Sequence, residues 1–272
     1  MPNRRNIYFF YKHDPELVKL IEPLHHVFQK YDFTIVEHPE DANIIVSVGG
    51  DGAFLQAIRK TGFREDCLYA GITTDKQTSL YCDFHIEDNA DGILHELTTN
   101  ASEDREIEVR KYPTIEVMLD DHSSFRCLNE CSVRSSIIKT FVIDVFVDDL
   151  HFETFRGDGL VISTPTGSTA YNKSLNGAVV DPQLPCFQVS EVASLNNNTY
   201  RTLGSSFILS GNRILTLKVQ QDGNDYPIIG MDNEAIAIRH TKDIRIRLSE
   251  KPIKTIKLKN NSYWEKVKRT FL

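Results

Sequence analysis

Residues 44–58 read Ile-Ile-Val-Ser-Val-Gly-Gly-Asp-Gly-Ala-Phe-Leu-Gln-Ala-Ile, and the rest of the chain is best understood from this stretch. The β-branched run 44–48 predicts a buried parallel strand. Apolar residues at 54, 55 and 58 then define one face of a helix. A strand thus leads through a glycine turn into a helix, whose first N–H groups lack intrahelical acceptors. Such a turn favours binding of an anion such as phosphate.

Asp51 is the unexpected member of this turn, because a carboxylate repels phosphate. Three roles are open to it: it could cap the helix, hold a metal ion, or take a proton from an attacking hydroxyl. Aspartate is a common N-cap, so capping alone accounts for the residue type. Capping does not require the glycines at 50 and 52, which let a ligand approach the backbone closely.

Strands and helices alternate through the first 104 residues. We expect strands at 7–11, 33–36, 44–48 and 68–72, and helices at 16–30, 53–60 and from 88 or 89 to 97. This order predicts a Rossmann-like α/β domain with a parallel sheet. Ligands of such sheets bind beyond the carboxyl ends of the strands, which places Gly49–Gly52 and the loop 73–81 at one rim.

The pattern changes near residue 105. Short alternating runs follow at 114–119, 124–128, 140–147, 213–219, 235–240, 243–248 and 254–258. They predict an all-β sandwich domain over residues 105–259. Residues 260–272 have apolar side chains at helical spacing (264, 267 and 271), and we expect this C-terminal helix to pack back on the first domain.

Composition narrows the class of protein. The 272 residues favour two domains, and 40% hydrophobic with 25% charged residues is typical of a soluble globular protein. A net charge of −7 argues against a nucleic-acid partner. No apolar run reaches the roughly 20 residues of a membrane span. Five scattered cysteines and the lack of a signal-like start predict reduced thiols in a cytoplasmic protein.

A second polar stretch, residues 155–174, reads Phe-Arg-Gly-Asp-Gly-Leu-Val-Ile-Ser-Thr-Pro-Thr-Gly-Ser-Thr-Ala-Tyr-Asn-Lys-Ser. Its hydroxyls and turn N–H groups suit sugar hydroxyls, a carboxamide or phosphate, and Tyr171 offers a ring for a base. A turn with a capped helix explains part of this pattern, but not so many small polar groups together. Taken alone, Glu130 is interpreted as a solvated surface charge and Asn129 as a turn residue. Neither a P-loop nor a G-x-G-x-x-G motif is present.

Together these stretches resemble the NAD kinase family over nearly the full chain. The motifs that carry the resemblance are Gly49-Gly50-Asp51-Gly52, Asn129-Glu130, and residues 157–174 with their Gly-Asp-Gly and Thr-Gly-Ser-Thr-Ala-Tyr-Asn-Lys-Ser segments. The first motif alone is weak, because lipid kinases and phosphofructokinases share it. The three motifs in this order are specific.

The resemblance implies an enzyme that moves the γ-phosphoryl group of ATP to the 2′-hydroxyl of the adenosine ribose of NAD. It also implies Mg²⁺ bound through the ATP phosphates, with no dedicated metal ligands, and a homodimer or homotetramer whose neighbouring subunit completes each site. Asp51 matches the catalytic aspartate, and Asp232 matches an acidic position near the phosphate donor. Cofactor contacts are implied for Gly50, Gly52, Tyr81, Asn129, Glu130, Asp158, Thr169, Ala170, Tyr171, Ser174 and Ala193.

Two positions depart from the family pattern. Leu80 stands where a phenylalanine often lines the adenine pocket, and Ala53 stands where threonine is usual. Three alternatives to an NAD kinase stay open: a lipid kinase with the same glycine turn, a non-catalytic NAD(P)-binding sensor, and a structural β protein with a chance turn. A lipid kinase would need an apolar groove, and the polar residues 164–174 suit a dinucleotide better.

Overall fold

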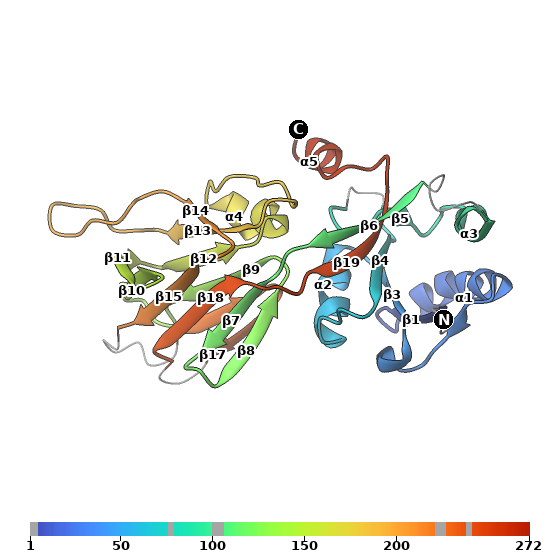
Figure 1. The fold of residues 1–272 in the computed structure, drawn as a ribbon, viewed down its shortest axis with the longest axis horizontal. Helices are drawn as coiled ribbons and strands as arrows, with labels where there is room; N and C mark the ends of the chain where they lie inside the picture. The colour runs from blue at the N-terminus through green and yellow to red at the C-terminus, as the bar shows by residue number, and fades with distance from the viewer. Residues whose placement is uncertain (1–4, 76–78, 100–105, 221–226, 238–240) are drawn as a thin grey trace. The chain divides into compact units, whose positions relative to one another are not determined.

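The computed structural model describes residues 5–75, 79–99, 106–220, 227–237 and 241–272. The chain forms two compact units, each with its own sheets (Figure 1). The first comprises Met1–Lys111 together with Ile253–Leu272, and the second comprises Tyr112–Pro252. The C-terminal segment thus returns to the unit in which the chain began.

The first unit is built on a seven-stranded sheet in the order β2-β1-β3-β4-β19-β6, with β5 paired to β4. Its strands are β1 (Asn6–Phe10), β2 (Thr34–Ile35), β3 (Ile44–Gly49), β4 (Leu68–Thr73), β5 (Phe84–His85), β6 (Ile107–Tyr112) and β19 (Ile253–Leu258). The pairs β1–β2, β1–β3, β3–β4, β4–β5 and β4–β19 are parallel. Gly49 at the end of β3 is in register with Thr73, so the segments after β3 and β4 leave the sheet at the same edge.

Helices cover both faces of this sheet (Figure 1). Helix α1 (Pro15–Lys30) begins at Asp14, whose side chain accepts the Leu17 N–H, and it continues through Pro23. With α3 (Ala90–Thr99) it lies on one face, where its apolar side chains join those of β1, β3 and β4. Helix α2 (Asp51–Lys60) buries Phe54, Leu55, Ala57 and Ile58 against the other face.

The second unit is a sandwich of two six-stranded antiparallel sheets. One sheet has the order β11 (Leu150–Gly157), β10 (Phe141–Val147), β15 (Ile214–Val219), β18 (Asp243–Leu248), β7 (Ile115–Leu119) and β8 (Ser123–Cys127). The other has the order β14 (Phe207–Ser210), β13 (Cys186–Val192), β12 (Gly159–Ser163), β9 (Glu130–Arg134), β16 (Ile228–Met231) and β17 (Glu234–Ala237).

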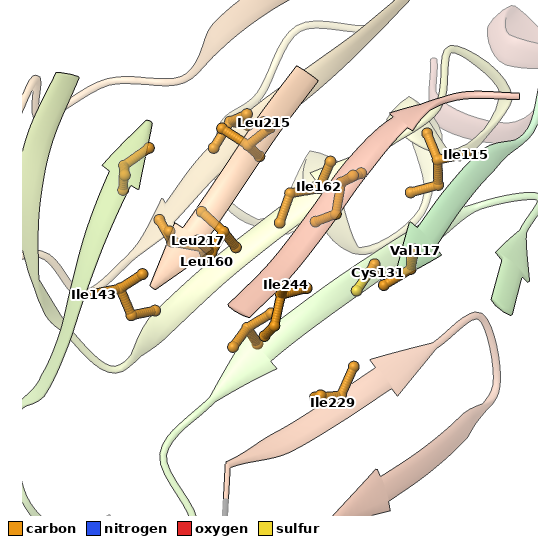
Figure 2. Packing of buried hydrophobic residues seen from close by; sticks show 14 of the residues in the cluster. Ile115, Val117, Cys131, Ile143, Leu160, Ile162, Leu215, Leu217, Ile229 and Ile244 are labelled. Atoms are coloured by element: carbon orange, nitrogen blue, oxygen red, sulfur yellow. The ribbon is translucent and has the colours of Figure 1, made fainter. Parts of the chain in front are cut away.

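The core of this unit lies between the two sheets. Figure 2 shows side chains of both sheets, among them Ile143, Leu217 and Ile244 from one and Cys131 and Ile162 from the other. All five are fully buried. Inward and outward residues alternate along β7, where Ile115, Val117 and Leu119 are buried and the two residues between them are half-buried, as the period-two pattern predicts.

The predicted fold class, an α/β domain followed by a β sandwich with the C-terminal helix returning to the first sheet, is confirmed. The sequence predicts domain boundaries after residues 104 and 259, whereas the two units meet after Lys111 and after Pro252. Strands β6 and β19, which fall in the range predicted for the sandwich, belong to the first sheet. Helix α5 (Tyr263–Phe271) also differs in its buried face, because Trp264 is 48% exposed and Lys266 is buried. Residues 238–240 of the predicted strand 235–240 lie outside the described residues.

Candidate active site

The glycine turn after β3 forms an open cradle at the start of α2. Gly49 has φ of 147°, and a β-carbon there would lie 2.7 Å from the Ala53 β-carbon. Gly50 is the N-cap of α2. At Gly50 and Gly52, in contrast, a β-carbon would meet nothing within 4 Å. The backbone at these two positions is therefore accessible to a ligand, at the helix end that favours anions.

The carboxylate of Asp51 does not cap the helix. Asp51 is the first residue of α2, and its carboxylate reaches the loop that follows β4. It accepts hydrogen bonds from the Leu80 N–H at 3.0 Å, the Tyr81 N–H at 2.9 Å and the Ser79 hydroxyl. The capping role that the residue type allowed is therefore wrong. Three donors fix the orientation of this carboxylate at the edge of the cradle.

Tyr81 belongs to the same loop, of which residues 76–78 lie outside the described part of the chain. Its ring is only 5% exposed and stacks on Phe54 of α2, with ring centroids 5.3 Å apart and planes 12° from parallel. Its side chain therefore faces the core of the first unit, while its N–H faces Asp51. Leu80, which stands in place of the family phenylalanine, is partly exposed.

Sequence reasoning missed a buried ionic cluster behind this loop. Asp83, Lys257 and Lys266 have side chains between 0% and 1% exposed, and both ammonium groups contact Asp83 Oδ1. The alternating pattern of β19 contains a signal for Lys257, which shares the buried face of Ile253 and Thr255. Nothing local marks Asp83 as its partner, because 174 residues separate them in sequence.

In the second unit, residues 164–169 lie directly against the backbone of residues 128–130. Hydroxyls of Thr164 and Thr166 donate to the Leu128 carbonyl at 2.5 and 3.1 Å. The Thr164 N–H donates to the Asn129 carbonyl at 2.8 Å. These hydroxyls are buried, so part of the polar character of the Pro-Thr-Gly-Ser-Thr turn serves to join it to the residues just before β9.

Glu130 is buried, and the interpretation of this residue as a solvated surface charge is wrong. It is 8% exposed, and its Oε2 has no hydrogen-bond partner among the described residues. Burial, together with the nearby carboxylate of Asp232, raises the pKa of Glu130 to about 8. The Tyr171 N–H donates to Glu130, which opposes this rise. Glu130 thus carries a proton at neutral pH and can donate a hydrogen bond.

Asp232 organises the same turn from the loop between β16 and β17. It has φ of 53°, and its carboxylate accepts the N–H groups of Leu128, Asn129 and Glu130 at 3.0, 2.7 and 3.2 Å. These three contacts fix the Asp232 carboxylate against the turn that leads into β9.

Of the predicted contact residues between 169 and 174, some lie next to the Glu130 carboxyl group and Ser174 does not. Tyr171 and Ala170 are half-buried beside it, at the start of α4 (Tyr171–Ser174). Thr169 is buried, and its hydroxyl donates to the Thr166 carbonyl at 3.2 Å. The Ser174 hydroxyl donates to the Tyr171 carbonyl at 2.7 Å and is exposed. The structure therefore brings Asn129, Glu130 and residues 169–171 together.

Asp158 and Ala193 lie at the opposite end of β12. The register pairs Ser163 with Glu130 at one end and Gly159 with Val192 at the other. At about 3.3 Å per residue, the Cα atoms of Asp158 and Thr164 are separated by roughly 20 Å. The two exposed residues are neighbours, since the Asp158 N–H donates to the Val192 carbonyl at 2.9 Å. Within one chain they form a second group, apart from Glu130.

Three further observations concern metal ligands, membrane-spanning helices and cysteine thiols. No group of three histidine, cysteine, aspartate or glutamate side chains suited to a metal ion occurs in the described part of the chain. Of the helices among these residues, none has the length and apolar character needed to cross a membrane. All five cysteines are buried thiols.

Solved structures share this fold. A crystal structure of an NAD kinase from Archaeoglobus fulgidus in complex with ATP superposes with a TM-score of 0.73 at 23% identity, covering 97% of this chain and 99% of that one. A yeast NADH kinase complexed with NADH gives 0.77 at 18% identity, covering 98% and 91%. The fold class is therefore that of the NAD(H) kinases.

Sequence comparison identifies the family. Residues 128–258 match the model of the ATP-NAD kinase C-terminal domain. The chain is 67% identical over 273 residues to NAD kinase 2 of Bacillus anthracis, covering 100% of both. It is 64% identical to NAD kinase 2 of Bacillus subtilis strain 168, covering 99% and 98%. The chain belongs to the NAD kinase family, a family of phosphotransferases.

Proposed function

We propose that the chain transfers the γ-phosphoryl group of ATP to the 2′-hydroxyl of the adenosine ribose of NAD, with Asp51 as the catalytic carboxylate. The observation that supports this most directly is the placement of Asp51. Its carboxylate is fixed by three donors beside the open backbone of Gly50 and Gly52. A phosphate group bound at the N-terminus of α2 would therefore lie next to the Asp51 carboxylate, and an acceptor hydroxyl could approach the same carboxylate.

Phosphoryl transfer depends mainly on positioning and on neutralising charge, because its transition state is loose and anionic. The N–H groups of the glycine turn would bind phosphate oxygens. Asp51 would orient the ribose hydroxyl and accept its proton as the new bond to phosphorus forms. Since the donors to Asp51 already hold it in one geometry, no reorganisation is needed when the hydroxyl arrives.

A divalent cation fits this arrangement as a partner of ATP. Asp51 supplies one carboxylate at the cradle, so a cation there would be held mainly by phosphate oxygens. Bound in this way, Mg²⁺ would neutralise triphosphate charge.

The second unit supports a dinucleotide acceptor. Glu130 is buried, protonated at neutral pH and has an Oε2 directed to no protein partner among the described residues. A protonated carboxyl group of this kind can donate to a ribose oxygen or to a base nitrogen. Tyr171, half-buried at its side, provides a ring surface for a base. These groups suit NAD better than the acyl chain of a lipid.

The separation of Asp158 and Ala193 from Glu130 favours a site completed by a second copy of the chain. One NAD molecule would then contact Glu130 of one protomer and the Asp158 end of β12 of its partner. This supports assembly as a homodimer or homotetramer. Buried thiols at all five cysteines are in keeping with a reducing cytoplasm.

The test is to mix the purified chain with Mg-ATP and NAD and to measure NADP. Formation of NADP that depends on both substrates supports the proposal. Parallel reactions with NADH and with polyphosphate define the acceptor and the donor. Phosphorylation of diacylglycerol in place of NAD would indicate the lipid kinase, and NAD binding without turnover would indicate the sensor.

A further inference from the structure

The loop that holds Asp51 is itself held from behind by the C-terminal segment of the chain. Lys257 lies on β19 and Lys266 on α5, and both ammonium groups are within contact distance of Asp83 Oδ1. The Leu258 N–H donates to the other oxygen of Asp83 at 2.9 Å. All three charged side chains are buried almost completely. None of these residues belongs to the glycine turn or to the nucleotide contacts described above.

The two lysines bind the carbonyl groups of Leu80 and Tyr81, the same two residues whose N–H groups face Asp51. On one side of the loop, the N–H groups of Leu80 and Tyr81 donate to the Asp51 carboxylate. On the other side, Lys266 Nζ donates to the Leu80 carbonyl at 3.1 Å and Lys257 Nζ donates to the Tyr81 carbonyl. The peptide unit that joins Leu80 to Tyr81 is therefore fixed from both sides, its N–H by the Asp51 carboxylate and its carbonyl by Lys266. Lys257 fixes the carbonyl of the next peptide unit along the loop.

Lys257 also reaches helix α2. Its ammonium group lies 5.5 Å from the centroid of the Phe54 ring, on which Tyr81 stacks. The cluster thus contacts both segments that determine where the Asp51 side chain points: the first turns of α2 and the loop 79–83.

The charge of Asp51 acts on this cluster together with that of Asp83. Lys257 and Lys266 carry two positive charges against one negative charge on Asp83. Burial opposes the ionisation of Asp83, but the two ammonium groups overcome it and lower its pKa. Burial lowers the pKa of Lys257, whereas Asp83 and Asp51 act to raise it. Burial also raises the pKa of Cys82 to about 11, so this thiol adds no charge at neutral pH.

Burying charged groups is costly unless each is paired and hydrogen-bonded, and such clusters are weak evidence for stability alone. Here the charged groups are directed at backbone atoms of one loop. We propose that Lys257 and Lys266, anchored on Asp83, are positioning residues that hold the Asp51 carboxylate in its catalytic orientation through residues 79–83. This inference rests on the proposed catalytic role of Asp51.

The decisive variant is Lys266→Met, which keeps the length and apolar stem of the side chain and removes the ammonium group. Lys268→Met on the exposed side of the same helix is the matched control. We expect kcat for NADP formation to fall about 100-fold in Lys266→Met, the loss that a small misplacement of a catalytic group produces. KM for NAD and ATP should stay within about threefold, and Lys268→Met should match the wild type.

A double-mutant cycle shows whether the effect passes through Asp51. In an Asp51→Asn background, Lys266→Met should reduce kcat by no more than about twofold, because the group it positions is already lost. Unchanged kcat in Lys266→Met alone, or losses that multiply in the double variant, would overturn the inference.

A measurement without turnover separates this inference from the proposed function. Hydrogen exchange of the Leu80 and Tyr81 amides should be on the order of tenfold faster in Lys266→Met than in Lys268→Met. Equal exchange would overturn the positioning role even if the wild type makes NADP. Should Lys266→Met not fold, Lys266→Gln retains N–H donors without the charge. The same faster exchange and lower kcat are expected from it, and wild-type values for both would count against the inference.

Discussion

The backbone of Gly167 lies directly against the backbone of Asn129: a β-carbon at residue 167 would be 2.0 Å from the Asn129 carbonyl oxygen. Its distances to the Asn129 carbonyl carbon and Cα would be 2.4 and 2.6 Å. Backbone atoms cannot turn aside as the end of a flexible side chain can. This close approach joins the turn 164–169 to the residues that carry the buried Glu130.

Gly167→Ala should therefore separate these two segments. We expect the free energy of unfolding to fall by about 3 kcal/mol, at the upper end of the usual cost of overpacking. Affinity for NAD should fall with it, because Asn129 and Glu130 move. Urea unfolding and NAD titration measure the two effects. Wild-type values for both would show that the contact is not required.

Gly52→Ala should have the opposite effect on stability. A β-carbon at residue 52 meets nothing within 4 Å, and Gly52 lies inside α2. Alanine in a helix is favoured over glycine, so the free energy of unfolding should rise by about 0.5–1 kcal/mol. Turnover should nevertheless fall, because the methyl group occupies the space through which phosphate approaches. Thermal unfolding measures the stability of the variant, and steady-state kinetics measure its kcat. A more stable variant with full turnover would show that Gly52 is not part of the phosphate site.

The alternation of strands and helices in the first unit could be predicted because each element has a local signal. A run of β-branched residues marks β3, a short mainly apolar run marks β4, and Asp14 followed by Pro15 marks the start of α1. The assignment of β19 to the first sheet could not be predicted in this way. A period-two pattern shows that a segment is a strand but not which sheet it joins, and the strand pairs with β4, about 185 residues earlier.

In the candidate site, too, residues in local motifs could be predicted from the sequence, and contacts between distant segments could not. Asp51 and the residues of the turn 164–171 are marked by glycines and by small polar residues in short motifs. The hydrogen bonds from Ser79, Leu80 and Tyr81 to Asp51, and the lysines behind them, depend on contacts between distant segments. The residue type alone predicts an exposed Glu130, because an isolated glutamate is usually exposed and only the fold places Asp232 and Tyr171 against it.

Glu130 should make stability depend on pH. Its pKa in the folded chain is raised from 4.5 to about 8, so between these values the folded state binds a proton that the unfolded state has lost. The stabilisation from this proton is complete below pH 4.5 and is lost as pH rises through 8.

Glu130→Gln keeps the size and the carbonyl acceptor for Tyr171 but cannot ionise. Relative to the wild type, it should gain up to about 5 kcal/mol in free energy of unfolding between pH 5 and pH 9. Urea unfolding of both proteins at pH 5, 7 and 9 measures the difference, from which other titrating groups cancel. If the free energies of unfolding of the two proteins changed with pH in parallel, the pKa of Glu130 would not be raised by folding.

Ser79→Ala removes one donor to Asp51 and leaves the carboxylate itself in place. The same hydroxyl oxygen accepts the Cys82 N–H at 2.7 Å, so the loop loses two hydrogen bonds. We expect the free energy of unfolding to fall by about 1–2 kcal/mol and kcat to fall by less than about tenfold. Urea unfolding and steady-state kinetics check both values. A larger loss of turnover would contradict the expectation that the Leu80 and Tyr81 N–H groups suffice to orient the Asp51 carboxylate.

Asp51→Asn, measured against the Ser79→Ala control for the same loop, tests the central claim most directly. The amide keeps one acceptor oxygen for the loop but has no negative charge to orient the ribose hydroxyl or accept its proton. The proposed role predicts that kcat for NADP formation falls on the order of 10²–10⁴-fold, while NAD affinity changes by no more than several-fold. Turnover within about tenfold of the wild type would contradict a catalytic role for Asp51 and the mechanism built on it.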